Sequence, residues 1–221
     1  MFKKKIFKDL SLKYSNHAYT GLMGFFMKKC HKQLENFKFP NNISKVLEIG
    51  AGTEPHYKYI KHTYEEYHII ETSNDINPDG YDNPKVKASN YDGKNIPYDN
   101  EYFDRIIISQ CLEHIVNPEE FLFEMMSKLK KGGVLSISLP TDPGVLFRLG
   151  RLYLKIFSIK KKYKITADQF DYMNATEHVN SIFGLHSIIK YNFKDSINES
   201  YLPLKIKSFD LNLFYNVHIL K

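Results

Sequence analysis

Residues 46–53 read VLEIGAGT, four residues suited to a buried strand followed by a turn with two glycines. A glycine-rich turn between a strand and a helix lets the backbone come close to a bound ligand. A dinucleotide-binding fold would place a third glycine three residues after Gly52, where this chain has Pro55. The turn therefore predicts a ligand contact without the pyrophosphate fingerprint. Glu48, two residues before Gly50, is suited to orient a cationic ligand or the amides of the turn.

Strand-like and helix-like segments alternate along the rest of the chain, which favours an α/β fold with a mostly parallel sheet. The expected strands after the first are Tyr67–Ile70, Lys85–Ala88, Arg105–Ser109 and Val134–Leu139. Helices are expected at residues 16–39 and 145–157, and another helix is expected to begin directly after the glycine turn. A helix at 118–129 is expected to stop at Gly132-Gly133, and Asn180 is expected to cap a helix at 181–191. Two late strands, Tyr201–Lys207 and Leu211–Leu220, are expected to form an antiparallel pair.

Further motifs follow the glycine turn in a fixed order. Glu71 ends the second strand, 21 residues after Gly50. The later motifs are DGKNIPY (92–98), DNEYFD (99–104), QCLEHI (110–115) and LKKGG (129–133). With VLEIGAGT, this ordered set resembles the class I S-adenosylmethionine-dependent methyltransferases, over about residues 44–140.

The resemblance implies a Rossmann-like, seven-stranded, mostly parallel sheet with helices on both faces and the C-terminal antiparallel pair. It implies S-adenosylmethionine as cofactor, S-adenosylhomocysteine as its product, and no metal ion. Glu71 would accept hydrogen bonds from the ribose hydroxyls, and Asp92 would meet the adenine amino group. The implied cofactor-binding residues are Glu48, Gly50, Ala51, Gly52, Glu71, Thr72, Asp92, Gly93 and Gln110.

The net charge of +6 divides unevenly along the 221 residues. Residues 1–45 hold ten lysines against two acids (+8), residues 46–140 carry −7, and residues 141–221 carry +5. An acidic centre suits a cationic sulfonium cofactor and argues against a main domain that grips phosphates. Two distant cysteines and a basic start broken by Lys8 and Asp9 favour a cytoplasmic protein over a secreted one.

Two histidines are candidates for the base that removes a proton from the methyl acceptor. His114, the first candidate, comes just after the fourth strand, where the active site of such a fold opens, and His178, the second, lies in the segment ATEHVN (175–180). The alternative for each is a packing or loop-ordering role. Nucleic-acid methylation is not expected, because residues 109–112 read SQCL in place of the D/N-P-P-Y segment and Cys111 does not follow a proline.

A less specific resemblance concerns the acceptor. LPTDPG (139–144), EHVN (177–180) and LNLF (211–214) are similar to segments of methyltransferases of bacterial surface-polysaccharide functions. This implies methyl transfer to a hydroxyl or amine of a small polar acceptor, such as a sugar or nucleotide-linked precursor of a capsule or O-antigen. The alternatives are a lipid-linked acceptor at the membrane surface, a non-catalytic cofactor-binding partner subunit, and an NAD oxidoreductase.

We expect a single domain with four regions: an N-terminal helical cover (1–44), a cofactor-binding core (45–140), an inserted lid (141–176), and a C-terminal helix and strand pair (177–221). The lid holds a basic amphipathic helix at 145–157, followed by further lysines at 160–164. Such a helix either packs on the core, attracts a phosphorylated acceptor, or lies on anionic lipid at the inner face of the membrane.

Overall fold

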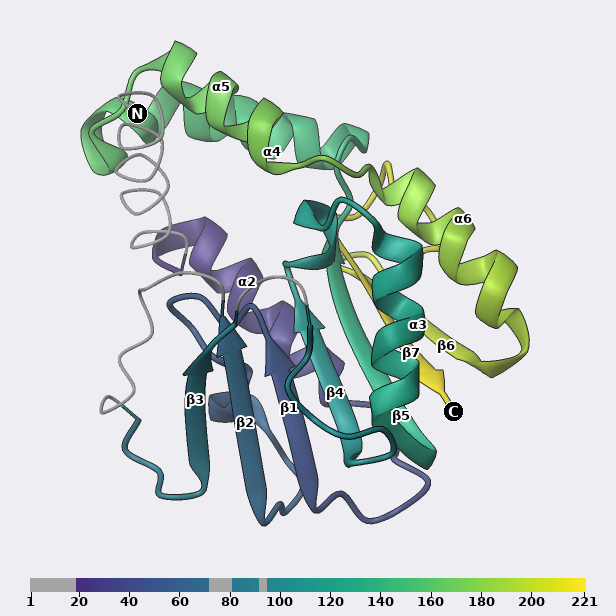
Figure 1. Cartoon of the computed structure of the whole chain (residues 1–221). Helices are drawn as coiled ribbons and strands as arrows, with labels where there is room; N and C mark the ends of the chain where they lie inside the picture. Colours follow the sequence, from purple (N-terminus) through teal and green to yellow (C-terminus); the bar gives the residue numbers. More distant parts are fainter. Residues whose placement is uncertain (1–18, 72–80, 92–94) are drawn as a thin grey trace.

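A computed structural model describes residues 19–71, 81–91 and 95–221, and its architecture is shown in Figure 1. Within these residues, seven strands form one sheet in the order β3-β2-β1-β4-β5-β7-β6. The β5–β7 and β6–β7 pairs are antiparallel, and the other neighbours are parallel. The expected Rossmann-like sheet with a C-terminal antiparallel pair is confirmed. The strands are β1 (Lys45–Ile49), β2 (Glu66–Glu71), β3 (Val86–Asn90), β4 (Phe103–Ser109), β5 (Leu129–Pro140), β6 (Ile197–Leu202) and β7 (Phe214–Leu220).

Helices cover both faces of the sheet (Figure 1). The α-helices are α2 (Gly21–Leu34), α3 (Pro118–Lys128), α4 (Val145–Phe157), α5 (Ala167–Glu177) and α6 (Ile182–Phe193). Short turns of other helix types are η1 (His56–Tyr59), η2 (Leu112–His114), η3 (Ile159–Tyr163) and η4 (Lys194–Ser196). Helices α4 and α5 lie beyond the carboxyl ends of the parallel strands. No helix in the described part of the chain is both long and apolar enough to cross a membrane.

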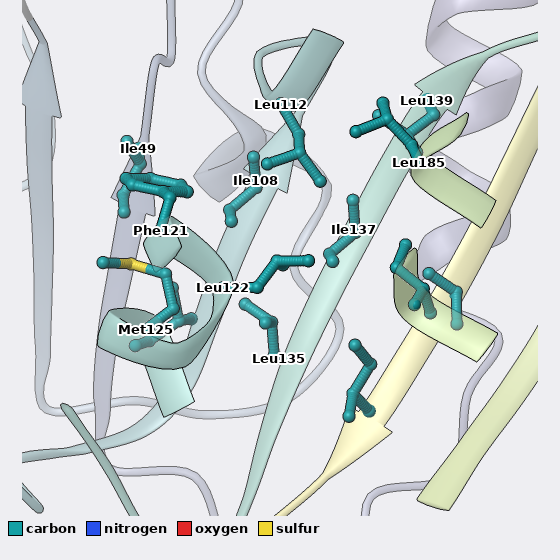
Figure 2. Packing of buried hydrophobic residues seen from close by; sticks show 14 of the residues in the cluster. Ile49, Ile108, Leu112, Phe121, Leu122, Met125, Leu135, Ile137, Leu139 and Leu185 are labelled. Atoms are coloured by element: carbon teal, nitrogen blue, oxygen red, sulfur yellow. The ribbon is translucent and has the colours of Figure 1, made fainter. Parts of the chain in front are cut away.

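The alternation of side chains along β4 divides the core into two layers. Ile106 and Ile108 pack in the cluster that includes Leu122 of α3, and Figure 2 shows part of this layer between α3 and the sheet. Ile107, between them, points to the opposite face and packs in the cluster that includes Leu34 of α2. This period of two is what a central strand covered on both faces requires.

Several expected elements have different bounds. The first strand of the late pair is Ile197–Leu202, not 201–207, because Pro203 lacks an amide donor and the chain leaves the sheet there. The Asn212 side chain then holds the connecting loop, accepting from the Leu204 amide at 2.9 Å and donating to the Ile206 carbonyl at 2.8 Å. Helix α2 ends at Leu34, earlier than expected, because the Glu35 side chain turns to buried partners.

Two helix-end predictions were wrong. Ser181, not Asn180, caps α6, with its Oγ accepting from the Gly184 amide at 3.2 Å. Asn180 instead donates from its side chain to the Ile115 carbonyl at 2.6 Å. Helix α3 ends at Lys128, and Leu129 already belongs to β5 opposite Phe103, so the glycines at 132 and 133 lie in that strand.

The structure also differs from the prediction after the glycine turn and within residues 141–176. The helix expected after the glycine turn is reduced to the four-residue η1, which follows Pro55. The α4 prediction is confirmed with the same bounds, 145–157. Helix α5 was not predicted. A capping box begins it: the Thr166 hydroxyl accepts from the Gln169 amide, and the Gln169 side chain accepts from the Thr166 amide.

Candidate functional site

The glycine turn joins β1 to η1 at the carboxyl edge of the sheet. Gly50 and Gly52 have φ values of +70° and +54°, a region where side chains with Cβ are strained. A Cβ on Gly50 would lie 2.5 Å from the Cys111 sulfur, so the loop after β4 touches the turn at this point. A Cβ on Gly52 would meet no atom of the described residues within 4 Å. The turn is therefore closed toward β4 and open on its outer side, as a backbone cradle for a ligand requires.

Glu71 reaches this turn from the end of the neighbouring strand β2. Its Oε2 accepts from the Gly52 amide at 3.0 Å. A carboxylate at the end of a parallel strand beside an open glycine turn is suited to bind a ribose diol. The arrangement fits the cofactor contact that the sequence predicts for Glu71.

Both carboxylate oxygens of Glu48 accept hydrogen bonds from other groups of the protein. It is buried, its Oε1 accepts from the His56 amide at 2.7 Å, and its Oε2 accepts from the Tyr67 hydroxyl at 2.7 Å. Burial raises the pKa of Glu48 to about 7, although both hydrogen bonds act to lower it. Glu48 was predicted to orient a cationic ligand or the amides of the glycine turn, whereas the amide that it holds belongs to His56, the first residue of η1.

The other predicted cofactor residues divide into two groups. Ala51 is buried within the turn. Gln110 has φ +53° at the carboxyl end of β4, and its side chain donates to the Ser138 hydroxyl at 3.0 Å. Thr72, Asp92 and Gly93 lie outside the described residues, so their cofactor contacts remain predictions.

The two predicted bases come together although they are 64 positions apart in sequence. The ring centroids of His114 and His178 are 5.2 Å apart, with the rings nearly perpendicular. His114 follows Cys111, the residue that touches Gly50, and its amide bonds to the Cys111 carbonyl at 3.0 Å. The histidine pair is thus joined through one short turn to the glycine cradle.

In each of the two histidine rings, Nδ1 is the nitrogen that contacts a neighbouring acceptor. The Nδ1 of His114 is 2.7 Å from the Glu177 carbonyl oxygen, and the Nδ1 of His178 is 2.9 Å from Oδ2 of Asp142. A carbonyl and a carboxylate only accept hydrogen bonds, so these contacts assign the hydrogen to Nδ1 of each ring. Nη2 of Arg151, a donor, also lies 3.3 Å from Nδ1 of His178, a longer contact than the 2.9 Å to Asp142. With the hydrogen on Nδ1, a neutral ring has its lone pair on Nε2.

Three side chains beside the histidine pair, those of Asp142, Arg151 and Glu113, were not predicted as site residues. Asp142, after β5, is held by the Arg151 guanidinium at 3.1 Å and 2.6 Å, besides its contact with His178. Glu113 is buried beside His114, and burial raises its pKa to about 7. The signal for Asp142 was present in sequence, as an acid directly after the fifth strand, and Glu113 lies within the LEH motif itself.

A cavity of about 450 Å³ opens beside this cluster, between α4 and α5. Its lining combines apolar side chains with polar and charged ones, and it includes Asp142, Arg151 and His178. Phe170 and Leu152 supply part of the apolar wall. The volume is in the range of small-molecule sites, next to the histidine pair.

The fold and the glycine cradle define an S-adenosylmethionine-dependent methyltransferase of class I. The chain belongs to the methyltransferase domain family, whose model matches residues 24–192. Its residues fit the cofactor, because Gly50, Gly52 and Glu71 form an open backbone turn next to a strand-end carboxylate. S-adenosylmethionine is the methyl donor of this class of enzyme.

Three known proteins illustrate the similarity. A demethylmenaquinone methyltransferase of Clavibacter sepedonicus is 33% identical over 94 residues, which are 41% of this chain and only 38% of that protein. The plantazolicin methyltransferase BpumL, solved with S-adenosylhomocysteine, superposes with a TM-score of 0.62 at 15% identity, covering 97% of this chain and 89% of that one. A possible histamine N-methyltransferase of Thermotoga maritima superposes at 0.56 with 19% identity, covering 89% and 90%. At these identities, the two structures show the fold alone.

Proposed function

We propose that this chain transfers the methyl group of S-adenosylmethionine to a hydroxyl or amine of a small polar acceptor. A sugar or a nucleotide-linked sugar, of the kind used for a capsule or O-antigen, is the acceptor class that we place first. The observation that carries the proposal is the His114–His178 pair, with ring centroids 5.2 Å apart and joined to the glycine cradle through Cys111. The catalytic roles of both histidines are part of the proposal.

The cavity between α4 and α5 supports a polar acceptor. Arg151 and Asp142 form an ion pair of 2.6 Å at its wall, and Asn174 offers an amide that is both donor and acceptor. Such groups fix hydroxyl-rich ligands by hydrogen bonds, while Phe170 gives an apolar surface for a ring. The acidic and basic side chains of the lining compensate one another, so the cavity favours the uncharged, hydroxyl-rich sugar part of such an acceptor.

In the proposed reaction, the cofactor supplies an electrophilic methyl group on a sulfonium. The acceptor oxygen or nitrogen forms the new bond to carbon, and the carbon–sulfur bond breaks with its electron pair left on sulfur. We place His178 before His114, the reverse of the order predicted from sequence, as the group that receives the acceptor's proton, because Asp142 orients the His178 ring through Nδ1. The fold mainly aligns the reactants and excludes water.

The test is a methyl-transfer assay with a panel of nucleotide-linked and free sugars, following S-adenosylhomocysteine release and the methylated product by mass spectrometry. We expect His178→Gln to lower kcat by about 10²–10⁴-fold while cofactor affinity stays the same. His186→Gln is the matched control, because His186 pairs with Glu199 on α6 and β6, away from this cluster. Intact cofactor binding without turnover on any acceptor would contradict the proposal and favour a non-catalytic partner subunit.

A lipid-linked acceptor is the second candidate, and a different observation favours it. None of the residues of α4 is buried, and its apolar side chains Leu149, Ile156 and Phe157 are all more than half exposed. The Clavibacter relative is named for demethylmenaquinone. We expect the chain to sediment with anionic vesicles and Ile156→Glu to abolish this, whereas Lys205→Glu in the β6–β7 loop has a smaller effect. Absence of sedimentation would remove this candidate.

A further inference from the structure

Glu113, His114 and His178 form a cluster of ligand-type side chains that the sequence analysis expected to be free of metal. One ligand atom from each residue can be chosen so that all three lie within 4.8 Å of one another. Two of the residues belong to η2 after β4, and the third follows α5. Two imidazoles and one carboxylate make a donor set that binds zinc and other divalent transition metals.

The Glu113 carboxylate is the strongest sign that something is missing from this cluster. The residue is 3% exposed, and its Oε2 has no hydrogen-bond partner among the residues that the structure describes. Its Oε1 lies 3.8 Å from Nε2 of His114, beyond hydrogen-bond distance. Native proteins rarely leave a buried carboxylate oxygen unsatisfied, since its desolvation is costly.

The histidines are already held in the manner of metal ligands. In protein metal sites, a ligating imidazole commonly donates its second ring N–H to a carboxylate or a backbone carbonyl. His114 donates from Nδ1 to the Glu177 carbonyl at 2.7 Å, and His178 donates from Nδ1 to Asp142 at 2.9 Å. With Nδ1 as the donor, a neutral ring has its lone pair on Nε2; for His178 this follows from the 2.9 Å contact with Asp142, which is shorter than the 3.3 Å contact of Nδ1 with Nη2 of Arg151.

We propose that the Glu113 carboxylate and the Nε2 atoms of His114 and His178 bind one divalent transition-metal ion, with zinc as the reference ion. Metal–ligand bonds of about 2.0–2.2 Å bring tetrahedral ligand atoms to roughly 3.3–3.5 Å from one another. The three ligand atoms lie within 4.8 Å of one another, so metal binding requires them to move closer, for which His114 has room because its side chain is 36% exposed. Three protein ligands leave one position open for a small molecule.

The surrounding charges favour a cation. Glu113 and Asp142 contribute two carboxylates, and Arg151 brings one positive charge, which its two-pronged contact with Asp142 compensates. The carboxylate of Glu113 is then not matched by a cation within 3.5 Å among the described residues. A bound metal ion would supply the missing positive charge, and it would also give Oε2 of Glu113 a partner.

A metal ion at this site would take part in the proposed methyl transfer, and in that respect the inference rests on the proposed function. Metal binding itself is measured without methyl transfer. In the proposed reaction, the open position would take the acceptor oxygen and lower the pKa of its hydroxyl. The imidazoles would then hold the metal and the proton would leave to water, so metal binding would replace the base role that the proposed reaction gives to His178. Metal binding itself requires neither the cofactor nor the correct acceptor.

The test uses the untagged full chain, stripped with a chelator and then dialysed against zinc. We expect one zinc per chain after gel filtration, and visible absorption bands when cobalt(II) replaces zinc. Glu113→Gln, His114→Ala and His178→Ala should each lower zinc affinity by more than about tenfold, and Asp142→Asn by roughly 10–100-fold. His186→Ala, which removes a histidine already paired with Glu199, should retain full binding.

The outcomes separate the metal site from the proposed function. Less than one zinc per chain at saturation, or equal zinc binding in the wild type and the three ligand variants, overturns the metal site. If Glu113→Gln does not fold, the half-exposed His114→Ala variant decides. Zinc binding without methyl transfer contradicts only the proposed function. Turnover that survives metal removal, with no zinc retained, contradicts only the part given to the metal in the reaction.

Discussion

Glu35 and Arg105 form an ion pair with 2.6 Å between Oε1 and Nη2, and both side chains are fully buried. The pair joins the end of α2 to the central strand β4. His56 adds a contact of 2.8 Å from its Nε2 to the same carboxylate oxygen, and the Phe39 ring lies 4.4 Å from the Arg105 guanidinium carbon. This buried network lies on the α2 side of the sheet. It links the end of α2, the η1 turn that follows β1, and the central strand β4.

Arg105→Met should destabilise the fold by about 3–5 kcal/mol, because it leaves the Glu35 carboxylate buried without its cation. The double variant Glu35→Gln/Arg105→Met should recover part of this loss, since it removes both charges. Urea unfolding followed by circular dichroism measures both. Lys58→Ala, which breaks the exposed i,i+4 pair with Glu54, is the control and should cost less than about 0.5 kcal/mol. Equal losses for Arg105→Met and Lys58→Ala would contradict the role of the pair.

The stability of the fold should fall in acid partly through His218. Burial, with the nearby charge of Arg105, lowers the pKa of His218 from 6.5 to about 3. Between these two values the unfolded chain binds a proton that the folded chain does not, so the unfolding free energy decreases as the pH falls. One such group contributes at most about 1.4 kcal/mol per pH unit. His218→Gln should flatten the stability profile between pH 6.5 and 3, and an unchanged slope would rule out this histidine.

Gly50→Ala should mainly lower the stability of the fold, whereas Gly52→Ala should mainly lower the affinity for the cofactor. Both place a Cβ at positive φ, which costs about 1–2 kcal/mol. Gly50→Ala also drives that carbon to 2.5 Å from the Cys111 sulfur, whereas the Cβ of Gly52→Ala enters open space. We expect Gly50→Ala to be the less stable protein by urea unfolding, and Gly52→Ala to fold but bind S-adenosylmethionine weakly by calorimetry. Full affinity in Gly52→Ala would show that the cofactor does not contact the turn.

Glu71→Ala should weaken S-adenosylmethionine binding by about 1.5–3 kcal/mol, the value of a charged hydrogen-bonding contact. Glu66, at the opposite end of the same strand, pairs with His68 and Lys87 and is the matched control. Glu66→Ala should leave the cofactor affinity unchanged. Calorimetric titration of the two variants decides, and similar affinities would remove Glu71 from the site.

The cofactor half of the site was largely predictable from sequence. Gly50 and Gly52 lie in the turn after β1, and Glu71 lies at the end of β2, the neighbouring parallel strand. The structure brings them together at the carboxyl edge of the sheet. Parallel strands place their carboxyl ends together, so the order of motifs along the chain already indicates their neighbourhood. The local turn geometry needed the structure, because Pro55 and the Glu48 contact leave only a short η1 where a full helix was expected.

The residues of the proposed acceptor site were predictable only one by one. His114 and His178 were singled out, but nothing in their spacing indicated that their rings lie 5.2 Å apart. Asp142 and Arg151 were not recognised, since their pairing depends on how α4 folds back over the end of β5. The buried Arg105 likewise looks in sequence like an interruption of an apolar strand, and its partner Glu35 is 70 positions away.

By itself, the sequence determined the class of fold and the position of the cofactor turn, because hydrophobic periodicity and glycine placement act over a few neighbouring residues. Only the tertiary structure decided which polar groups meet. Glu113, His114, Asp142 and His178 come from three separate segments, and packing of α4 and α5 beyond the sheet edge brings them together. Burial also depends on that packing, and it is burial that leaves the Glu113 carboxylate without a hydrogen-bond partner at Oε2 among the described residues.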